Sequence, residues 1–240
     1  MSRLLLPLLA LAVGLAAGGW LQRNDLPRRV AEHFGWLGDA EVELTPFYWR
    51  TLKYQHRVTQ NTLPGTVHFI GDSFVQGLAV SAVATPAVNF GIGGDTTLGM
   101  LRRIPEYPSL RSARAVVLAG GYNDLWRHDD DYIVANYRRI LAALPKGVPV
   151  VLTALFPVNE RIEPALAGKN RRIAGLNRRL AALCGGWPGC HFLDIGDRLR
   201  DGDGQLAAPY QAGDGLHLVG EGNAIWIRAL RAVLTRVAPD

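Results

Sequence analysis

The segment Val67-His68-Phe69-Ile70-Gly71-Asp72-Ser73-Phe74 is an apolar run that ends in a glycine and two small polar residues. A short run of β-branched and aromatic residues closed by a turn signal predicts a buried β-strand. Ser73 is the only one of the chain's five serines that follows such a strand and precedes a helical stretch. The segment therefore predicts a sharp strand-to-helix turn that holds the hydroxyl of Ser73 in front of a helix N-terminus.

Four more short apolar runs follow along the chain, and amphipathic stretches separate them. The runs are Ala87 to Ile92, Ala115 to Ala119, Val148 to Leu155 and His191 to Ile195, and the helical stretches include Asp131 to Leu144, Lys169 to Leu183 and Glu221 to Val237. Five strands that alternate with helices predict an α/β fold, in which a parallel sheet is covered by helices on both faces. Ligand sites in such sheets lie beyond the carboxyl ends of the strands, so the loops after the strands are the places to search.

The loops after four of these strands carry the residue types that acyl transfer requires. They are Gly71-Asp72-Ser73 after the first strand, Gly91-Ile92-Gly93-Gly94-Asp95 after the second, Gly120-Gly121-Tyr122-Asn123 after the third and Asp214-Gly215-Leu216-His217 after the fifth. Together they offer a hydroxyl, backbone N–H groups in a glycine-rich loop, an amide donor, and a carboxylate beside an imidazole.

These groups can be assembled into a serine hydrolase mechanism. Ser73 would be the nucleophile, and His217 would be the base that takes its proton. Asp214, three residues before His217, would fix the tautomer of the imidazole and stabilise the imidazolium. The backbone N–H groups of Ser73 and Gly94 and the side-chain amide of Asn123 would surround the oxyanion, where one donor is typically worth about 2.7–4 kcal/mol.

In this order the four segments resemble the SGNH hydrolases, also called the GDSL esterase and lipase family. The family's nucleophile falls on Ser73, its oxyanion donors on Gly94 and Asn123, and its acid and base on Asp214 and His217. The resemblance implies a flavodoxin-like fold, a three-layer α/β/α sandwich around the five-stranded parallel sheet. It also implies hydrolysis of carboxylic esters without a metal or a cofactor.

The resemblance spans about residues 66–237 and has one mild departure. Phe74 stands where the family often has leucine or isoleucine, a change that affects packing and not chemistry. As substrates the resemblance allows short-chain acyl esters, O-acetylated sugars of an envelope polysaccharide and lysophospholipids. The alternative function is an O-acyltransferase, which would use the same triad to pass the acyl group to a sugar hydroxyl of an envelope polysaccharide.

The chain before this domain divides into two parts. Leu4 to Leu21 is an apolar run without a charge, which predicts a signal peptide or membrane anchor in residues 1–24 and hence an exported, periplasmic or outward-facing tethered protein. Residues 25–64 predict a helical segment, with Thr45 and Pro46 as its N-cap and first turn. Its aromatic stripe, which we expect to pack, is Phe47, Tyr48, Trp49, Leu52 and Tyr54. Residues 65–240 form the predicted esterase domain.

The sequence argues against several other functions. The net charge of +5 comes almost entirely from arginines scattered along the chain, without the basic cluster of a nucleic-acid-binding protein. The glycines from Gly91 to Gly94 do not complete a G-x-G-x-x-G phosphate cradle, because the required third glycine is Thr96. The run from His128 to Asp131 precedes a helix and is typical of a cap rather than a metal site. We therefore expect an ester of a small molecule, glycan or lipid as the partner, and neither nucleic acid nor metal.

Cys184 and Cys190 are the only cysteines, and they fall at the end of a predicted helix and the start of the fifth strand. This position is the amino edge of the sheet, opposite Ser73 and His217, so the cysteines are not catalytic. The short turn between them predicts a disulfide in an oxidising compartment, the alternative being two buried thiols that only pack. The sequence leaves open the oligomeric state and whether the leader is cleaved.

Overall fold

The computed structural model describes residues 43–239, so the predicted leader and residues 25–42 of the predicted helical segment lie outside the described residues. The sheet lies in the compact unit Pro46–Asp240. The strands are β1 (Val67–Gly71), β2 (Ala87–Gly91), β3 (Ala115–Ala119), β4 (Val150–Thr153) and β5 (Cys190–Leu193). The helices of the described residues are α4 (Pro46–Thr59), α5 (Ser73–Gln76), α6 (Thr97–Arg103), α7 (Asp130–Ala143), α8 (Lys169–Gly185), α9 (Gly196–Leu199) and α10 (Gly220–Val237). Each predicted strand is present, with ends that differ by at most two residues from the prediction.

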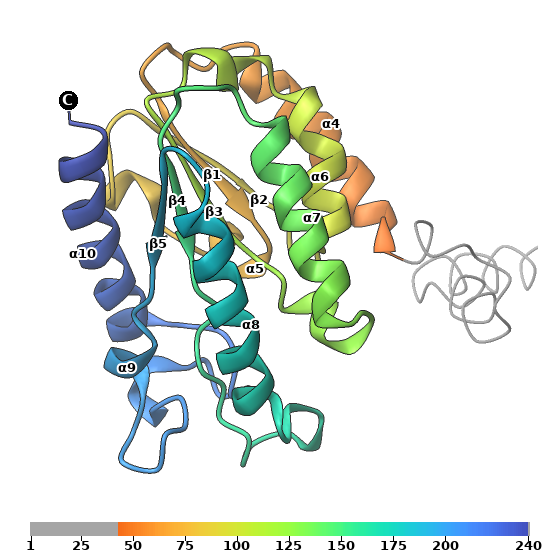
Figure 1. Ribbon diagram of the computed structural model, residues 1–240, viewed down its shortest axis with the longest axis vertical. Coiled ribbons are helices and arrows are strands. Elements are labelled where there is room, and N and C mark those ends of the chain that lie inside the picture. Colours follow the sequence, from red (N-terminus) through yellow and green to blue (C-terminus); the bar gives the residue numbers. More distant parts are fainter. Residues whose placement is uncertain (1–42, 240) are drawn as a thin grey trace, which may run out of the picture. The chain divides into compact units, whose positions relative to one another are not determined.

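The five strands form one parallel sheet in the order β2-β1-β3-β4-β5. Strand β2 lies on one side of β1, and β3, β4 and β5 follow in order on the other side of β1. Helices α4, α6, α7 and α8 cover one face of the sheet and α10 covers the other (Figure 1). The predicted three-layer, flavodoxin-like fold is thus confirmed. The direction of building reverses between β1 and β3, and crevices at such reversals are where open α/β sheets place their ligands.

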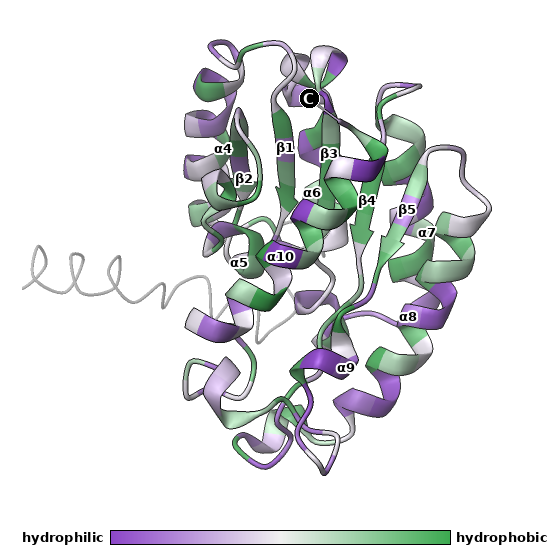
Figure 2. Ribbon diagram, turned by 90° about the vertical axis from the view of Figure 1, so that its left-hand side faces the viewer, coloured by the Kyte–Doolittle hydropathy of each residue, from purple (hydrophilic) through white to green (hydrophobic). Residues whose placement is uncertain are grey.

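The core lies on both faces of the sheet. Every residue of β1 and β3 is buried, and Figure 2 shows both strands as hydrophobic. Helix α8 packs against the sheet with Ile173, Leu176 and Leu180, which recur at helical spacing. From the opposite side α10 contributes Trp226 and Leu230. Apolar strands buried on both faces are typical of parallel sheets, and they give the loops at the carboxyl edge a rigid base.

Helix α4 buries one narrow stripe, formed by Tyr48, Gln55 and Thr59. These residues recur at steps of seven and four, so they lie on one side of a helix with 3.6 residues per turn. The expectation that the whole aromatic stripe packs is wrong. Successive side chains of a helix point about 100° apart, so the residues next to Tyr48 in the sequence point away from the buried side. The exposed aromatic residues of the helix are Phe47, Trp49 and Tyr54.

The buried stripe of α4 ties the helix to the carboxyl edge of the sheet. The hydroxyl of Tyr48 donates to the backbone oxygen of Gly99 in α6 at 3.0 Å. The amide of Gln55 donates to the backbone oxygen of Gly91, the last residue of β2, at 3.1 Å. Helix α4 therefore supports the loop that follows β2.

The disulfide between Cys184 and Cys190 is present, with a distance of 5.2 Å between the two Cα atoms. It joins the end of α8 to the first residue of β5, at the amino edge of the sheet. The predicted position and pairing are confirmed.

Reduction of this disulfide is expected to lower the melting temperature modestly and to leave kcat unchanged. The closed loop is short, and the chain-entropy estimate for such a loop is below about 3 kcal/mol. Calorimetry with and without a thiol reductant, beside ester hydrolysis measured well below the melting temperature, tests both parts. A loss of kcat in protein that is still folded would contradict the assignment of the cysteines to a purely structural role.

Candidate active site

Ser73 directly follows a one-residue turn between β1 and α5. Strand β1 ends at Gly71 and α5 begins at Ser73, so Asp72 alone makes the turn. The carboxylate of Asp72 caps the helix by accepting from the backbone N–H of Phe74 at 3.0 Å. Gly71 must lack a side chain, because a Cβ there would lie 1.8 Å from the backbone oxygen of Ala119 in β3. This sharp turn places the serine at the carboxyl edge of the sheet, as predicted.

The structure brings Ser73, His217 and Asp214 into one line of contacts. The Oγ atom of Ser73 is 2.8 Å from Nε2 of His217. The Nδ1 atom of the same ring is 2.5 Å from Oδ2 of Asp214. When Nδ1–H donates to the carboxylate, Nε2 is the nitrogen that can accept the serine proton. The geometry is that of a nucleophile, a base and an orienting acid.

The carboxylate of Asp214 is held in its ionised form. Its Oδ1 atom accepts from the backbone N–H groups of Leu216 and His217, each at 2.9 Å. Partial burial acts to raise the pKa of Asp214, but the ring of His217 and these two N–H groups lower it below its ordinary value. A charged carboxylate at neutral pH fixes the tautomer of the imidazole.

The loop that carries His217 is anchored on the loop after β4. Gly215 has a φ of +73°, and a Cβ on it would lie 2.8 Å from the backbone oxygen of Asn159. The backbone N–H of Asn159 in turn donates to the oxygen of Gly215 at 2.8 Å. On its other side, the imidazole lies 5.4 Å from the ring centroid of Phe74. These contacts restrict the position of the base relative to Ser73.

The predicted oxyanion donors come from the loops after β2 and β3. Gly94 has a φ of +77°, while a Cβ there would have open space around it, so its conformation explains the glycine. The side-chain amide of Asn123 donates to the backbone oxygen of Asp95 at 2.9 Å. This bond uses one N–H proton of the amide, and an asparagine amide carries two. The side chain of Gln76 steadies the same loop by accepting from the N–H of Gly93.

Arg103 is a buried residue of the site that the sequence analysis missed. Its guanidinium donates to the carboxylate of Asp95 and to the backbone oxygen of Gly71, each at 2.8 Å, and also to the backbone oxygen of Phe90. It thereby joins the ends of β1 and β2 to the loop that carries Gly94. Burial acts to raise the pKa of Asp95, and the guanidinium opposes that shift. In the sequence, Arg103 is one of many scattered arginines, and no local pattern marks it as buried.

A second buried contact joins the loops after β2 and β3. The backbone N–H and the hydroxyl of Thr97 both donate to the carboxylate of Asp124, the residue after Asn123. The amide of Asn136 in α7 donates to the same hydroxyl. Hydrogen bonds to a carboxylate are stronger than neutral ones, so this contact fixes the loop of Asn123 relative to the loop of Gly94.

Asp72 lies completely buried beneath the nucleophile. Burial raises its pKa to about 7, and the nearby carboxyl groups of Asp95 and Asp124 act in the same direction. The carboxyl group of Asp72 therefore binds its proton more tightly in the folded protein than in the unfolded chain, where its pKa is about 4. This contribution to the free energy of unfolding is fully present below about pH 4 and is lost as the pH rises through about 7.

Asp72→Asn is therefore expected to gain stability relative to the wild type between pH 4 and pH 8. The asparagine can keep the helix cap but cannot ionise, so the difference in unfolding free energy shifts toward the variant by at most about 4 kcal/mol. Denaturant unfolding of both proteins across this pH range measures the difference. If the free energy of unfolding depended on pH in the same way in both proteins, Asp72 would not titrate in this range.

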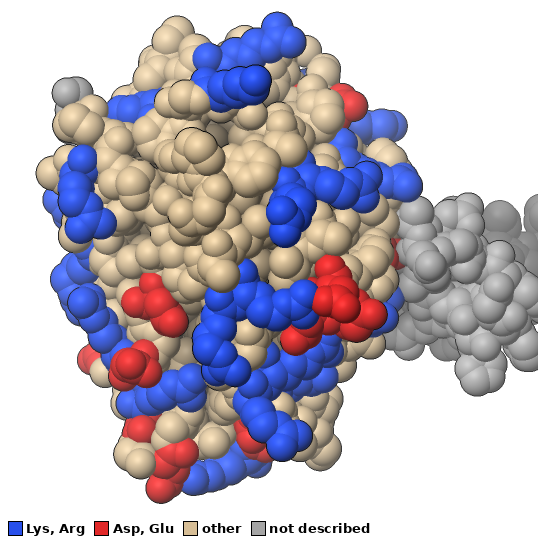
Figure 3. All heavy atoms as spheres, viewed as in Figure 1, with Lys and Arg blue, Asp and Glu red and all other residues tan. Residues whose placement is uncertain are grey.

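The acidic run at the start of α7 caps that helix, as predicted. Asp129 accepts from the backbone N–H of Tyr132 at 2.8 Å. Asp130 and Asp131 form ion pairs with arginines of α8 at 2.8 and 2.5 Å. Within residues 43–239, no three His, Cys, Asp or Glu side chains gather as metal ligands would. Figure 3 shows basic side chains at many separate places on the face in view, around an uncharged area in its upper half and with acidic side chains among them in the lower half.

Residues 69–225 match the model of the GDSL-like lipase/acylhydrolase family. The chain belongs to this family. Like other GDSL-like hydrolases it is a carboxylic ester hydrolase. It is 30% identical over 200 residues to the rat platelet-activating factor acetylhydrolase IB subunit alpha1, and the alignment covers 79% of this chain and 83% of that protein.

Solved structures share the fold of this GDSL-like hydrolase. A GDSL-like lipase from Bacteroides thetaiotaomicron matches with a TM-score of 0.67 and 21% identity, over 77% of this chain and 97% of that one. A carbohydrate acetylesterase from Sinorhizobium meliloti matches with a TM-score of 0.56 and 18% identity, over 72% of this chain and 98% of that one. At these identities the likeness establishes the three-layer fold.

Proposed function

We propose that this GDSL-like hydrolase is a serine esterase that cleaves esters of small acyl groups, acetyl foremost, through an acyl-Ser73 intermediate. The observation that carries the proposal is the unbroken contact from Oγ of Ser73 through the ring of His217 to Asp214. The family membership supports the reaction class, and the site geometry supports the roles of the three residues.

In the acylation step, Nε2 of His217 takes the proton of Ser73 while Oγ bonds to the carbonyl carbon of the ester. Negative charge develops on the carbonyl oxygen, where the backbone N–H groups of Ser73 and Gly94 and the amide of Asn123 can donate to it. The bond to the alcohol then breaks, and the alcohol leaves with the proton held by His217. The ionised Asp214 stabilises the imidazolium while it exists.

In the deacylation step, His217 takes a proton from water, and the resulting hydroxide oxygen bonds to the acyl carbon. The same donors stabilise the second oxyanion. The acyl–Oγ bond breaks, the proton returns from His217 to Ser73, and the carboxylic acid leaves.

Two relatives support acetyl as the acyl group. The rat relative is named an acetylhydrolase, and the Sinorhizobium protein is named a carbohydrate acetylesterase. In addition, residues 66–237 contain no long apolar insertion of the kind that forms a lipid-binding lid. We infer that the alcohol part of the ester is a glycan or a lipid headgroup.

A panel of esters tests the acyl preference. p-Nitrophenyl acetate, butyrate and octanoate, an acetylated xylo-oligosaccharide and a lysophosphatidylcholine would be compared by kcat/KM. We expect acetyl esters to give the highest values and the values to fall with chain length. A preference for octanoate or for the lysolipid would overturn the small-acyl assignment without affecting the triad.

The same panel separates a hydrolase from an O-acyltransferase. Each ester is assayed with and without an unacetylated sugar acceptor, and free acid and acylated sugar are both quantified. A hydrolase releases one free acid per ester consumed whether or not the sugar is present. Acyl groups recovered mainly on the sugar would assign the transferase function instead.

We also propose that the domain works outside the cytoplasm. The apolar run from Leu4 to Leu21 supports export, and the pair of Cys184 and Cys190 suits an oxidising compartment. None of the helices in residues 43–239 has the length and apolar character needed to cross a bilayer. Intact-mass analysis of protein from its native compartment, alkylated without reductant, tests the proposal. Two alkylated thiols would overturn it.

A further inference from the structure

Helix α4 has an outer face that takes part neither in the core nor in the catalytic contacts. We define the α4 outer face as six exposed residues, which are Phe47, Trp49, Arg50, Lys53, Tyr54 and Arg57. The buried stripe of the helix points to the opposite side, toward the sheet.

The aromatic side chains of this face are unusually exposed. Phe47, Trp49 and Tyr54 are 40%, 49% and 63% exposed, and Leu63 in the turn after the helix is 67% exposed. These four are among only six large hydrophobic side chains that are exposed within residues 43–239. A concentration of exposed apolar groups on one surface marks a docking site.

The charge of the face has a single sign. Residues 46–59 contain no Asp or Glu, whereas Arg50, Lys53 and Arg57 lie at the centre of the exposed side. Glu106 lies at the edge of the face, where it pairs with His56 at 3.8 Å. The surface is thus basic with aromatic flanks, and its charge complements an anionic partner.

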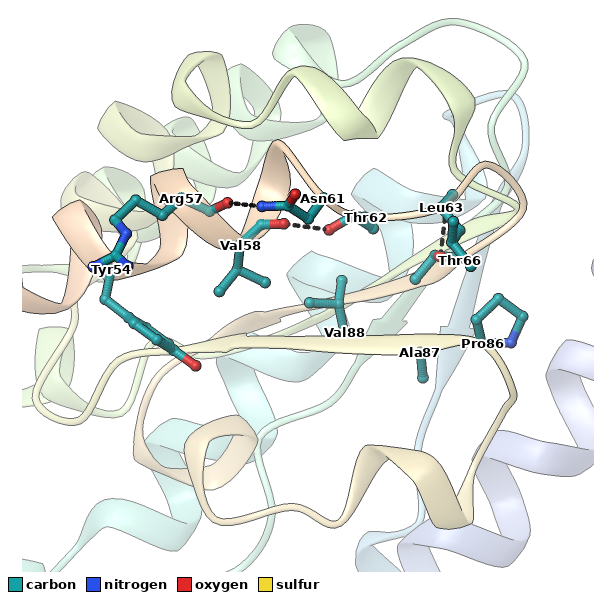
Figure 4. Close-up of a pocket in the computed structure, with 10 residues that line it drawn as sticks. All are labelled: Tyr54, Arg57, Val58, Asn61, Thr62, Leu63, Thr66, Pro86, Ala87 and Val88. Atoms are coloured by element: carbon teal, nitrogen blue, oxygen red, sulfur yellow. Dashed lines mark hydrogen bonds between the residues drawn. The ribbon is translucent and has the colours of Figure 1, made fainter.

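The apolar part of the surface continues into a groove between α4 and β2, the edge strand of the sheet. Figure 4 shows Val58 of α4 and Val88 of β2 pointing into the space between the two elements. Tyr54 lies at one end of this groove and Leu63 at the other (Figure 4).

We propose that the α4 outer face binds the surface of an anionic lipid bilayer. Arginine and lysine side chains attract anionic headgroups, and aromatic rings settle at the level of the headgroups. The sequence supports a membrane as the partner, because the apolar run ends at Leu21 and α4 begins at Pro46, a short distance along the chain. The roughly 24 residues between them span at most about 80 Å when extended, so a membrane that holds the run is within reach of α4.

The α4 outer face lies next to the loop that carries the predicted oxyanion donor Gly94. A Cβ on Gly93, next to Gly94 in the oxyanion loop, would lie 3.8 Å from the ring of Phe47. A bilayer bound to this face therefore lies beside the carboxyl edge of the sheet, where it would present surface-bound esters to Ser73. This consequence rests on the proposed function, whereas the lipid contact does not.

A nitroxide label on the full-length protein tests the lipid contact directly. Tyr54→Cys provides the labelling site, and Thr235→Cys on α10, on the opposite face of the sheet, is the control. Both are labelled without reductant and placed on vesicles of phosphatidylcholine alone or with 30% phosphatidylglycerol. We expect the label at 54 to become accessible to oxygen and shielded from a water-soluble nickel complex only on the anionic vesicles. The label at 235 should stay in water on both.

Charge removal supplies the matched comparison. Replacing Arg50, Lys53 and Arg57 by serine should weaken docking of the label at 54 by about 10²-fold, since each basic residue near an anionic leaflet contributes about fivefold. The same change at Arg228, Arg231 and Arg236 of α10 removes equal charge from the opposite face and should leave docking intact. Circular dichroism confirms that both triple variants are folded.

Two outcomes overturn the proposal. One is a label at 54 that stays in water on anionic vesicles. If the protein then binds a soluble acidic polysaccharide instead, the partner of the α4 outer face is that polymer and not a bilayer. The other is an equal loss of docking in both triple variants, which would assign the contact to net charge and not to the α4 outer face.

Discussion

Ser73→Ala is expected to lower kcat for p-nitrophenyl acetate by about 10⁶-fold, the loss seen when the serine of a catalytic triad is removed. The melting temperature should stay close to that of the wild type, because the change removes one oxygen and leaves the cap from Asp72 to Phe74 in place. Steady-state kinetics and thermal unfolding measure the two effects. Ser81→Ala, at an exposed serine in the turn Val80–Ala82, is the matched control and should keep full activity.

His217→Ala should cost a comparable factor, and the double variant with Ser73→Ala should lose little more. Residues of a triad act as a unit, so their effects do not add. Esterase activity near the wild-type level in a folded Ser73→Ala variant would contradict the mechanism. Losses that multiply in the double variant would indicate that the two residues act in separate steps.

Asn123→Ala is expected to lower kcat by about 10²–10³-fold with little change in KM. The amide donates to an oxygen whose charge develops mainly in the transition state, so its loss affects the chemical step more than substrate binding. The variant should still react with a fluorophosphonate at Ser73, but more slowly. A change confined to KM would assign Asn123 to substrate binding.

The bond from Asn123 to the backbone oxygen of Asp95 makes a structural control necessary. Asn177→Ala provides it, because the amide of Asn177 in α8 donates to the backbone oxygen of Leu155 at 2.8 Å in a comparable contact. Loss of that contact should affect stability and leave kcat within a few-fold of the wild type. An equal fall in kcat in both variants would attribute the effect of Asn123 to loosening of the fold.

The sheet and the catalytic residues could be predicted because their signals are local. Each strand is a short apolar run, and a parallel sheet needs such runs because both of its faces are buried. Ser73 is recognisable from the strand before it and the helix after it. His217 and Asp214 are recognisable because the carboxylate and the imidazole meet across one turn of four residues.

The residues that brace the site could not be predicted, because their roles depend on contacts between distant segments. Arg103 lies on α6 but holds backbone oxygens at the ends of β1 and β2, and only the folded sheet brings these together. The outer face of α4 was misjudged for a related reason. Aromatic residues in a run suggest packing, yet helix geometry leaves only Tyr48 of the four aromatic side chains buried. The predicted leader lies outside the described residues, so its role stays a prediction.

Covalent trapping with a fluorophosphonate, followed by peptide mass spectrometry, tests the central claim most directly. The reagent reacts only with a serine whose proton is removed by a positioned base, so it reports the nucleophile and the contact with His217 together. The account predicts a single adduct, on the peptide that contains Ser73, with loss of esterase activity in proportion to labelling and no adduct in Ser73→Ala. An adduct on another serine, or full activity after complete labelling of Ser73, would contradict it.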